Sequence, residues 1–246
     1  MRFLVFLIAL FVIGCKPATE KEPDKSIKRE KPKISLGDQF ELEVGDLLFQ
    51  DLDCGPFCDA IEKVTFGVNG AQFSHNGIIS RIDNDAVWVL EAVIKGVVET
   101  QLDSFLIKSA DSKGQPKVLV GRLRNEYLHL GPMAVENARR HLGKSYDDYF
   151  DILNDRYYCS ELLYLAFKEA NGGQPVFQLR AMTFEDPDTK EPFPKWVEYF
   201  QELNYSIPEG QPGINPGSMS RSIYLDIVHA YGKPEGWRGS TLRTRD

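Results

Sequence analysis

The chain has 246 residues, of which 42% are hydrophobic and 26% are charged, with 15 Phe and 10 Tyr. This size and composition predict one globular domain with a single hydrophobic core. The formal net charge is −7, and no long basic face is present in the sequence, which argues against nucleic acid as a partner.

The N-terminus has the pattern of an export signal. A positive start at Arg2 is followed by an unbroken apolar run over 3–13, which is shorter than the roughly 20 residues of a membrane-spanning helix. The run ends in Val-Ile-Gly-Cys (12–15), which resembles a bacterial lipobox. We therefore predict a signal peptide over 1–14 and lipidation of Cys15, with the mature protein held on a membrane of the bacterial cell envelope, periplasmic or surface-facing. An ordinary signal peptide with a cysteine nearby by chance is the alternative.

A solvated tether is predicted between the anchor and the folded domain. Together with Cys15 it spans 15–36, where Pro, Lys and Glu dominate and almost nothing is apolar. Such a segment cannot bury enough surface to fold. The folded domain is predicted over 37–238, followed by a tail at 239–246.

The first half of the domain is predicted to consist mainly of strands. A buried strand is expected at 44–50 and a short helix at 59–65. Apolar segments at 73–82 and 86–93 flank Asp83-Asn84-Asp85, a pattern typical of a β-hairpin. Strict alternation at 117–124 predicts one more strand.

Helices are predicted in the second half. The segment 132–142 has a Pro near its first turn and Gly143 at its end. Apolar residues at helical spacing mark 158–170, which Asn171-Gly172-Gly173 terminates. A further helix is expected at 196–203. Strands followed by helices, without alternation or internal repeats, indicate an α+β fold.

Cys159 is the candidate nucleophile, because it falls where the helix at 158–170 begins. The unpaired N–H groups and positive dipole potential of a helix start lower the pKa of a thiol, and the same N–H groups can hold an oxyanion. The alternative is a small, buried, unreactive cysteine in a packed helix start.

A thiol nucleophile needs a base, and His75 in Phe-Ser-His-Asn-Gly-Ile-Ile is the best candidate of the four histidines. His129, His141 and His229 lie in settings typical of solvated or structural side chains. Glu91, a carboxylate among apolar neighbours, lies on the partner strand of the expected hairpin. An odd-length loop around Asn84 would place His75 and Glu91 on one face of the sheet, whereas an even-length loop without a bulge would separate them.

Several motifs together resemble one known family, the YiiX/YebB-like cysteine hydrolases. These are a circularly permuted branch of the NlpC-type papain-like superfamily. The resemblance covers about 37–230 and rests on GDLLFQ (45–50), FSHNGII (73–79), VLEA (89–92), HLGKSYDDYF (141–150), YYCSELLY (157–164) and NPGSMSRS (215–222). It implies a small antiparallel sheet or partial barrel packed against helices. It also implies Cys159 as nucleophile, His75 as general base and Glu91 as the orienting third member, with no cofactor.

Three further residues are candidates for the cleft or the oxyanion site. Gln50 ends a predicted strand near the site and could donate a hydrogen bond to an oxyanion, although a solvated strand end is equally compatible. Tyr146 and Tyr158 could line the cleft, although tyrosines are also common at the edge of a core.

The pair Cys54 and Cys58 departs from the family pattern. A disulfide is favoured by the oxidising compartment and by proximity, provided that Gly55-Pro56 bends the chain. Two free thiols remain an alternative. A third is a zinc set formed with His75 and Cys159.

These features together predict an exported, lipid-anchored cysteine hydrolase. The resemblance implies cleavage of peptide or peptidoglycan-type amides through a thioester at Cys159. One alternative is lipid acyl transfer or thioester cleavage on the same three residues, and another is a non-catalytic lipoprotein that binds lipid or peptide. The expected partners are a membrane, through the N-terminal lipid, and an amide or lipid substrate in the envelope.

Overall fold

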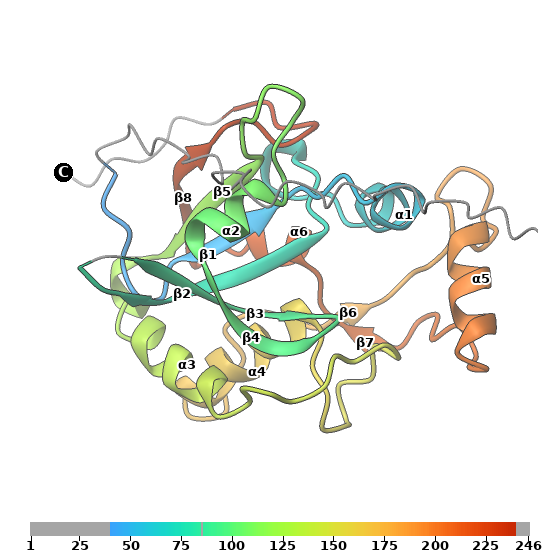
Figure 1. The fold of residues 1–246 in the computed structure, drawn as a ribbon. Helices are drawn as coiled ribbons and strands as arrows, with labels where there is room; N and C mark the ends of the chain where they lie inside the picture. The colour runs from blue at the N-terminus through green and yellow to red at the C-terminus, as the bar shows by residue number, and fades with distance from the viewer. Residues whose placement is uncertain (1–39, 85, 240–246) are drawn as a thin grey trace, which may run out of the picture. The chain divides into compact units, whose positions relative to one another are not determined.

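The structure is a computed structural model, and it describes residues 40–84 and 86–239 (Figure 1). The predicted signal peptide, Cys15, the tether and residues 240–246 of the predicted tail lie outside the described residues. Within the described ranges, no helix is both long enough and apolar enough to cross a membrane.

Six strands form one sheet in the order β4-β3-β2-β1-β5-β8, and every pair of neighbours is antiparallel. The strands are β1 (Leu47–Gln50), β2 (His75–Ile82), β3 (Val87–Val93), β4 (Gly96–Gln101), β5 (Val118–Leu123) and β8 (Leu225–Tyr231). Two short strands, β6 (Arg180–Ala181) and β7 (Pro212–Gly213), form a separate ribbon.

Helices cover both faces of the sheet. α3 and α4 pack on one face against β2 and β3, whereas α2 packs on β3 and β4 from the other (Figure 1). α1 and α5 contact each other at one end of the molecule. The helices are α1 (Pro56–Val64), α2 (Leu102–Ile107), α3 (Leu130–Arg139), α4 (Cys159–Ala170), α5 (Pro194–Glu202) and α6 (Pro216–Ser220), with 3₁₀ turns at Val68–Gly70 and Asn125–Tyr127. The predicted α+β fold, an antiparallel sheet packed against helices, is confirmed.

Burial on both faces of the sheet explains why the first three residues of β1 are apolar. Leu47 and Phe49 pack with residues of α3 and α4, while Leu48 packs with Phe105 of α2. All four side chains of β1 are fully buried. Because successive side chains point to opposite faces and both faces are covered, the strand shows no polar alternation.

The predicted elements are present, with ends shifted by a few residues, but six helices and strands were missed: α2, β4, β6, β7, α6 and β8. β8 shows alternating burial and carries the signal of a half-buried strand. α2 has only six residues, too few for a helical period to be visible. β4 follows β3 after a two-residue turn, and no separate strand was predicted there.

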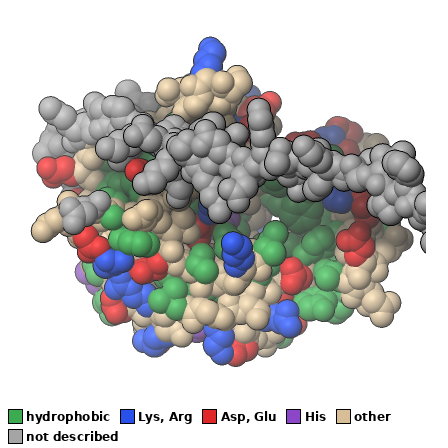
Figure 2. Space-filling view, in the orientation of Figure 1, with side chains coloured by type: hydrophobic (Ala, Val, Ile, Leu, Met, Phe, Trp, Pro, Cys, Tyr) green, Lys and Arg blue, Asp and Glu red, His purple; other side chains and the backbone are tan. Residues whose placement is uncertain are grey.

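The surface in view carries charges of both signs. Figure 2 shows Lys and Arg side chains interspersed with Asp and Glu, and hydrophobic side chains among them. Such mixing produces no large field of one sign on this face.

Candidate active site

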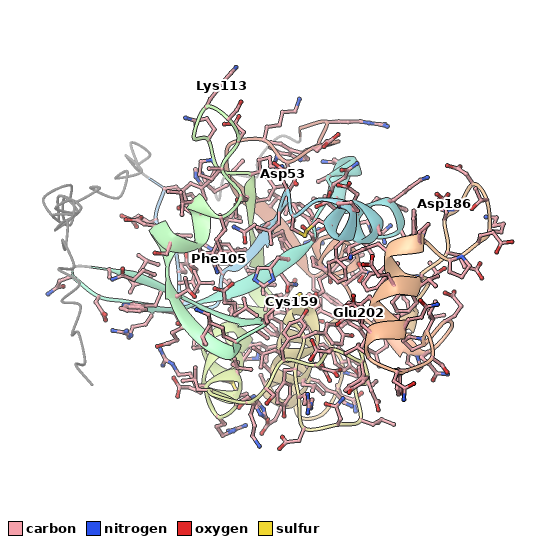
Figure 3. The ribbon with its side chains drawn as sticks, turned by 45° about the vertical axis from the view of Figure 1, so that its right-hand side comes forward. Asp53, Phe105, Lys113, Cys159, Asp186 and Glu202 are labelled. Carbon is pink, nitrogen blue, oxygen red and sulfur yellow. A yellow bond between two sulfur atoms is a disulfide. The ribbon has the colours of Figure 1, made fainter. Side chains whose placement is uncertain are left out.

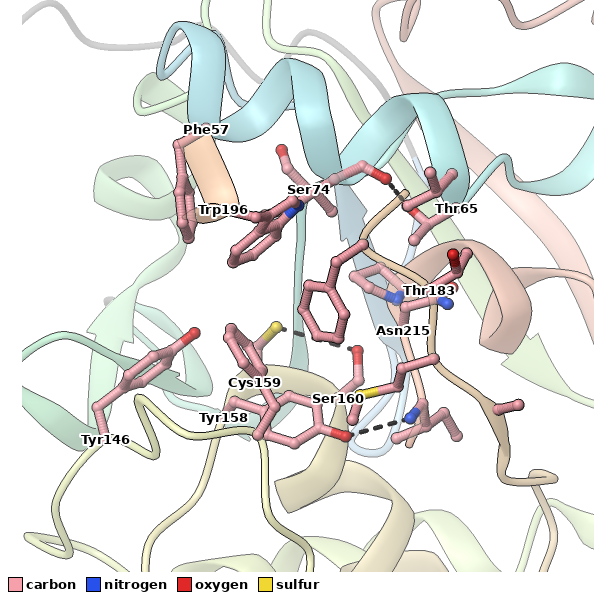
Figure 4. Close-up of a pocket in the computed structure, with 18 residues that line it drawn as sticks. Phe57, Thr65, Ser74, Tyr146, Tyr158, Cys159, Ser160, Thr183, Trp196 and Asn215 are labelled. Atoms are coloured by element: carbon pink, nitrogen blue, oxygen red, sulfur yellow. Dashed lines mark hydrogen bonds between the residues drawn. The ribbon is translucent and has the colours of Figure 1, made fainter. Parts of the chain in front are cut away.

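Cys159 is the first residue of α4, so the helix begins at the candidate nucleophile. A helix leaves its first N–H groups without intrahelical acceptors, and Cys159 contributes one of them. Its thiol lies 3.9 Å from the hydroxyl of Ser160, and the backbone N–H of Asn76 on β2 favours its ionised form. The side chain is 7% exposed and lines a pocket (Figure 4), which makes the thiol both positioned and accessible.

A β-bulge in the hairpin places His75 and Glu91 on one face. The loop between Ile82 and Val87 has an even number of residues, which by itself would separate the two side chains. The register shifts at Ser80, between the pairs Arg81↔Trp88 and Ile79↔Val89. The extra residue restores the parity, so Glu91 becomes the diagonal neighbour of His75 in the continued register.

The imidazole and the carboxylate are in direct contact. His75 Nε2 lies 2.7 Å from Glu91 Oε2, which leaves Nδ1 as the nitrogen available to Cys159. The other oxygen of Glu91 accepts hydrogen bonds from Thr100 Oγ1 at 2.5 Å and Lys108 Nζ at 2.7 Å. Each oxygen of this fully buried carboxylate therefore has a donor, and the imidazole is held in one orientation.

The electrostatics favour an ion pair between the thiol and the imidazole. Burial disfavours the imidazolium, but the interactions with Cys159 and Glu91 outweigh it and raise the pKa of His75 to about 9. Burial also opposes ionisation of Cys159, yet His75, Ser160 and the N–H of Asn76 lower the pKa of the thiol overall. At neutral pH these shifts favour thiolate and imidazolium.

The pocket in front of Cys159 has a volume of about 130 Å³. Aromatic side chains from segments far apart in sequence form its wall, and Trp196 of α5 lies at their centre. Its ring is 4.7 Å from Phe57 of α1, 5.0 Å from Phe184 and 5.7 Å from Phe150, measured between centroids. The pocket therefore offers the reacting centre an apolar surface.

Two of the three further candidates face this pocket. Tyr146 and Tyr158 line it on either side of Cys159 (Figure 4). The hydroxyl of Tyr158 accepts the N–H of Ile214 at 3.1 Å. Burial raises the pKa of Tyr146, and the negative charge of Cys159 raises it further, so the Tyr146 hydroxyl stays protonated and able to donate.

Gln50 does not fit the expected oxyanion role. Its Nε2 donates to the carbonyl of Phe105 at 2.6 Å and to Ser109 Oγ at 3.1 Å. Although Gln50 is the direct partner of His75 across β1 and β2, both amide hydrogens are used. The side chain attaches the sheet to α2 and does not line the pocket.

Cys54 and Cys58 form a disulfide with their Cα atoms 5.3 Å apart. Gly55, with φ of 75°, bends the chain between them, and α1 begins at Pro56. This arrangement excludes the zinc alternative, because both thiols are used in the disulfide and neither remains as a thiolate ligand. In the described ranges Cys159 is the free cysteine.

Two of the other three histidines pack against aromatic rings, and His129 is exposed. His229 stacks on Phe40 with ring centroids 4.4 Å apart, and His141 contacts Tyr157 at 4.3 Å. His129 precedes α3. Of the four, His75 is the one that contacts Cys159.

Sequence reasoning missed a second buried carboxyl group. Glu161, two residues after the nucleophile, is fully buried, and its Oε2 accepts the N–H of Tyr158 at 3.1 Å. Burial raises its pKa to about 9, with further contributions from Asp147, Asp151 and Cys159. Glu161 is therefore uncharged at neutral pH. A glutamate three residues after the residue that precedes a helix is a capping signal that could have identified it.

The donors to Glu91 were also missed. Thr100 lies on β4 and Lys108 directly follows α2, two elements that the sequence did not reveal. The register Glu91↔Val98 places Thr100 on the same face as Glu91, so recognition of β4 would have predicted Thr100. No local sequence pattern would have predicted that Lys108 contacts Glu91.

Comparison with known proteins gives a consistent picture. Residues 41–229 match the model of a family described as permuted papain-like amidase enzymes, YaeF/YiiX, C92 family. The uncharacterized protein YiiX of Escherichia coli K12 is 30% identical over 147 residues, which are 59% of this chain and 67% of that protein. A crystal structure titled as the metalloprotein yiiX from Escherichia coli O157:H7 is similar with a TM-score of 0.60 and 25% identity, over 79% of this chain and all of that one.

The word metalloprotein applies to that structure. In the described part of this chain, no group of three or more His, Cys, Asp or Glu side chains is placed to hold a metal ion, and His75 interacts with Cys159 on one side and Glu91 on the other. The residues present do not fit a metal centre. The extent of the family match shows that the chain belongs to the permuted papain-like amidases of the YaeF/YiiX family and is an enzyme of the cysteine hydrolase type.

Proposed function

We propose that this protein is an exported, lipid-anchored cysteine hydrolase that cleaves peptide or peptidoglycan-type amide bonds through a thioester at Cys159. The contact of Cys159 and His75, with Glu91 2.7 Å behind the imidazole, carries the proposal. A thiol, a base and an orienting carboxylate in this order are the parts that nucleophilic acyl transfer requires.

The reaction follows from the charge states of the pair. The Cys159 thiolate attacks the amide carbonyl, and the imidazolium of His75 gives its proton to the leaving amine, so that a thioester forms and the C–N bond breaks. Water then attacks the thioester while His75 takes up its proton, and Cys159 is released. Glu91 keeps the imidazole oriented and stabilises its charge throughout.

The developing oxyanion needs donors on the pocket side of Cys159. The N–H of Cys159 at the start of α4 is one, since it has no intrahelical acceptor. The hydroxyl of Tyr146 is the second, because it lines the same pocket and stays protonated. Tyr146 takes the role that Gln50 cannot fill.

The wall of the pocket favours a substrate with an apolar group beside the scissile amide. Phe57, Phe184 and Trp196 present rings there, and burial of apolar surface contributes about 25 cal/mol per Å². The same wall favours a second candidate function, in which Cys159 accepts the fatty acyl group of a lipid and transfers it or releases it to water.

Two thiol-reactive probes with matched warheads, one on a peptide amide and one on a fatty acyl chain, test this function. Wild type should be labelled at Cys159, and Cys159→Ala should remain folded but unlabelled. Faster labelling by the peptide probe supports the amidase, and faster labelling by the acyl probe supports the lipid alternative. Equal absence of labelling and turnover in wild type would leave a binding lipoprotein as the remaining explanation.

Placement in the cell envelope rests on the sequence of residues 1–15. Cells fed a labelled fatty acid should produce a labelled, membrane-bound protein, and Cys15→Ser should lose the label and the membrane association. Cys159→Ala is the matched control and should keep both. Membrane association of an unlabelled Cys15→Ser protein would refute the anchor.

A further inference from the structure

A second cavity of about 370 Å³ lies beside the catalytic pocket. Ile214 lines both cavities. Ala181 of β6 faces the catalytic pocket, whereas its neighbour Arg180 faces the second cavity. The two cavities therefore share a wall, but they differ in the chemistry of their linings.

The second cavity contains two arginines, Arg180 and Arg221. In the described part of the chain, neither guanidinium has an ion-pair or hydrogen-bond partner. Five other described arginines form ion pairs with carboxylates, namely Arg81, Arg122, Arg124, Arg139 and Arg140. Exposed Arg156 and Arg238 form none with the described residues, but neither lines the cavity that Arg180 and Arg221 share. Arg180 and Arg221 are both exposed, so water reaches their guanidinium groups, but an anion between them would be attracted by both positive charges.

Arg221 is held in place without a carboxylate. Its guanidinium lies 4.2 Å from the centroid of the Phe66 ring, a cation–π contact that fixes the planar group while leaving its N–H donors at the cavity. Burial lowers the pKa of Arg221, and the nearby positive charge of Arg180 lowers it further. The two like charges are thus close enough to repel each other.

The lining of the second cavity also contains a hydroxyl donor, Ser222. Ser222 Oγ accepts the N–H of Tyr224 at 3.3 Å, so its own proton is available to another acceptor. Guanidinium groups present forked donors that match the paired oxygens of a phosphate or a carboxylate.

We propose that Arg180 and Arg221, with Ser222, form a binding site for an oxyanion group, a phosphate or a carboxylate, in the cavity beside Ile214. The bound group accepts hydrogen bonds from both guanidiniums and relieves their repulsion. The cavity is larger than a bare ion needs, so the oxyanion is the charged end of a larger molecule. This site stands independently of catalysis at Cys159.

Binding of inorganic phosphate and of acetate tests the proposal, each titrated at an ionic strength held constant with sodium chloride. Calorimetry gives the affinity, and the thermal unfolding midpoint gives an independent readout, because a ligand of the native state raises it. Phosphate should bind wild type saturably and raise the midpoint. Arg180→Gln or Arg221→Gln should weaken binding roughly tenfold each, and the double variant should lose the response.

Arg156→Gln is the matched control. Arg156 is exposed, lies 6.0 Å from the ring centroid of Tyr149 and is not part of the cavity, so the variant makes the same charge change and should bind phosphate like wild type. Arg221→Lys keeps the positive charge but loses the forked N–H donors of the guanidinium, so it should bind phosphate with intermediate affinity. Unfolding midpoints measured without anion establish that each variant is folded.

The relative affinities decide which oxyanion the site prefers. A tighter response to phosphate indicates a phosphoryl ligand, and a tighter response to acetate indicates a carboxylate. Either result supports the site if the double variant loses it. Saturable binding that persists in the double variant would overturn the proposal, as would the absence of saturable binding of both probes to wild type.

Discussion

Two buried glutamates lie near Cys159, the proposed nucleophile, and differ in charge. Glu91 lies on the sheet side, behind His75, and Glu161 lies on the helix side, in the first turn of α4. Both side chains are fully buried. The pKa of Glu91 is nevertheless lowered to about 2, whereas that of Glu161 is raised to about 9.

The difference comes from the partners of each carboxyl group. Burial alone would raise the pKa of both. For Glu91, hydrogen bonds and charge from His75 and Lys108 outweigh burial. Glu161 has one backbone N–H as a donor, and Asp147 and Asp151 near it add negative charge.

The charge states of Glu91 and Glu161 both favour the thiolate form of Cys159. The ionised Glu91 holds the positive charge of His75 and thereby favours the thiolate. The neutral Glu161 keeps a negative charge away from that thiolate, which it would otherwise disfavour. Burial therefore does not determine the charge of a carboxyl group in this site, and four substitutions can test the contrast.

Replacement of His75 should have the largest effect. His75→Ala removes the base and the positive charge beside Cys159, so turnover should fall on the order of 10²–10⁴-fold. Alkylation of Cys159 by iodoacetamide at pH 7 should slow in parallel, because burial then raises the pKa of the thiol. Circular dichroism and the unfolding midpoint check the fold, and His75→Gln serves as a second variant. An unchanged alkylation rate in both folded variants would contradict the ion pair.

Glu91→Gln should have the next largest effect. Loss of this charge should lower the pKa of His75 from about 9, so at a given pH less imidazolium is present. We expect turnover to fall roughly 10- to 100-fold, because loss of an adjacent opposite charge shifts a pKa by roughly one to two units. In wild type the rate should decline as the pH rises through about 9, and in Glu91→Gln this decline should occur at lower pH. An alkaline limb at the same pH in both proteins would refute the role of Glu91.

Lys108→Gln should have a smaller effect. Lys108 is 38% exposed, and its contact with Glu91 is one of three to that carboxylate. Partly exposed ion pairs contribute on the order of 1 kcal/mol or less, so turnover should fall by about fivefold or less. Lys113→Gln makes the same charge change on an exposed loop away from Cys159 (Figure 3) and should leave the rate unchanged. Equal losses in the two variants would indicate a general charge effect.

Glu161→Gln should have the smallest effect, and this result completes the contrast. Because Glu161 is uncharged at neutral pH, the amide changes no charge and its oxygen can still accept the N–H of Tyr158. Turnover and alkylation at pH 7 should remain within about threefold of wild type, a change below 1 kcal/mol. A loss as large as that of Glu91→Gln would show that Glu161 is ionised in the native protein.

Much of the reacting centre could be predicted from local sequence. Short segments of sequence place Cys159 at a helix start, His75 at the start of an apolar strand and Glu91 on the next strand. In such segments the hydrophobic periodicity and the residues that end a helix or strand can be recognised. The order of these motifs also carried the resemblance to the family that the comparisons confirm. Local patterns suffice here because each residue is placed by its own element.

Three features of the site were decided only by the tertiary structure. The bulge at Ser80 determines whether His75 and Glu91 share a face, and the loop sequence does not reveal it. Gln50 was one candidate for the oxyanion site, with a solvated strand end as the alternative, but its amide is buried and donates to the carbonyl of Phe105 in α2. The aromatic wall combines side chains of α1, α5 and the segment between α4 and α5. No local sequence pattern predicts that these segments meet.

The charges of Glu91 and Glu161 show most clearly what the sequence determines and what only the tertiary structure decides. The sequence places one glutamate two residues after Cys159 and another among the apolar residues of a predicted strand, and neither pattern shows which of the two ionises. Which one ionises depends on donors that lie far away along the chain, Thr100 and Lys108 in one case, and on carboxylates gathered nearby in the other. Electrostatic interactions depend on distance in space, and distance in space is set by packing.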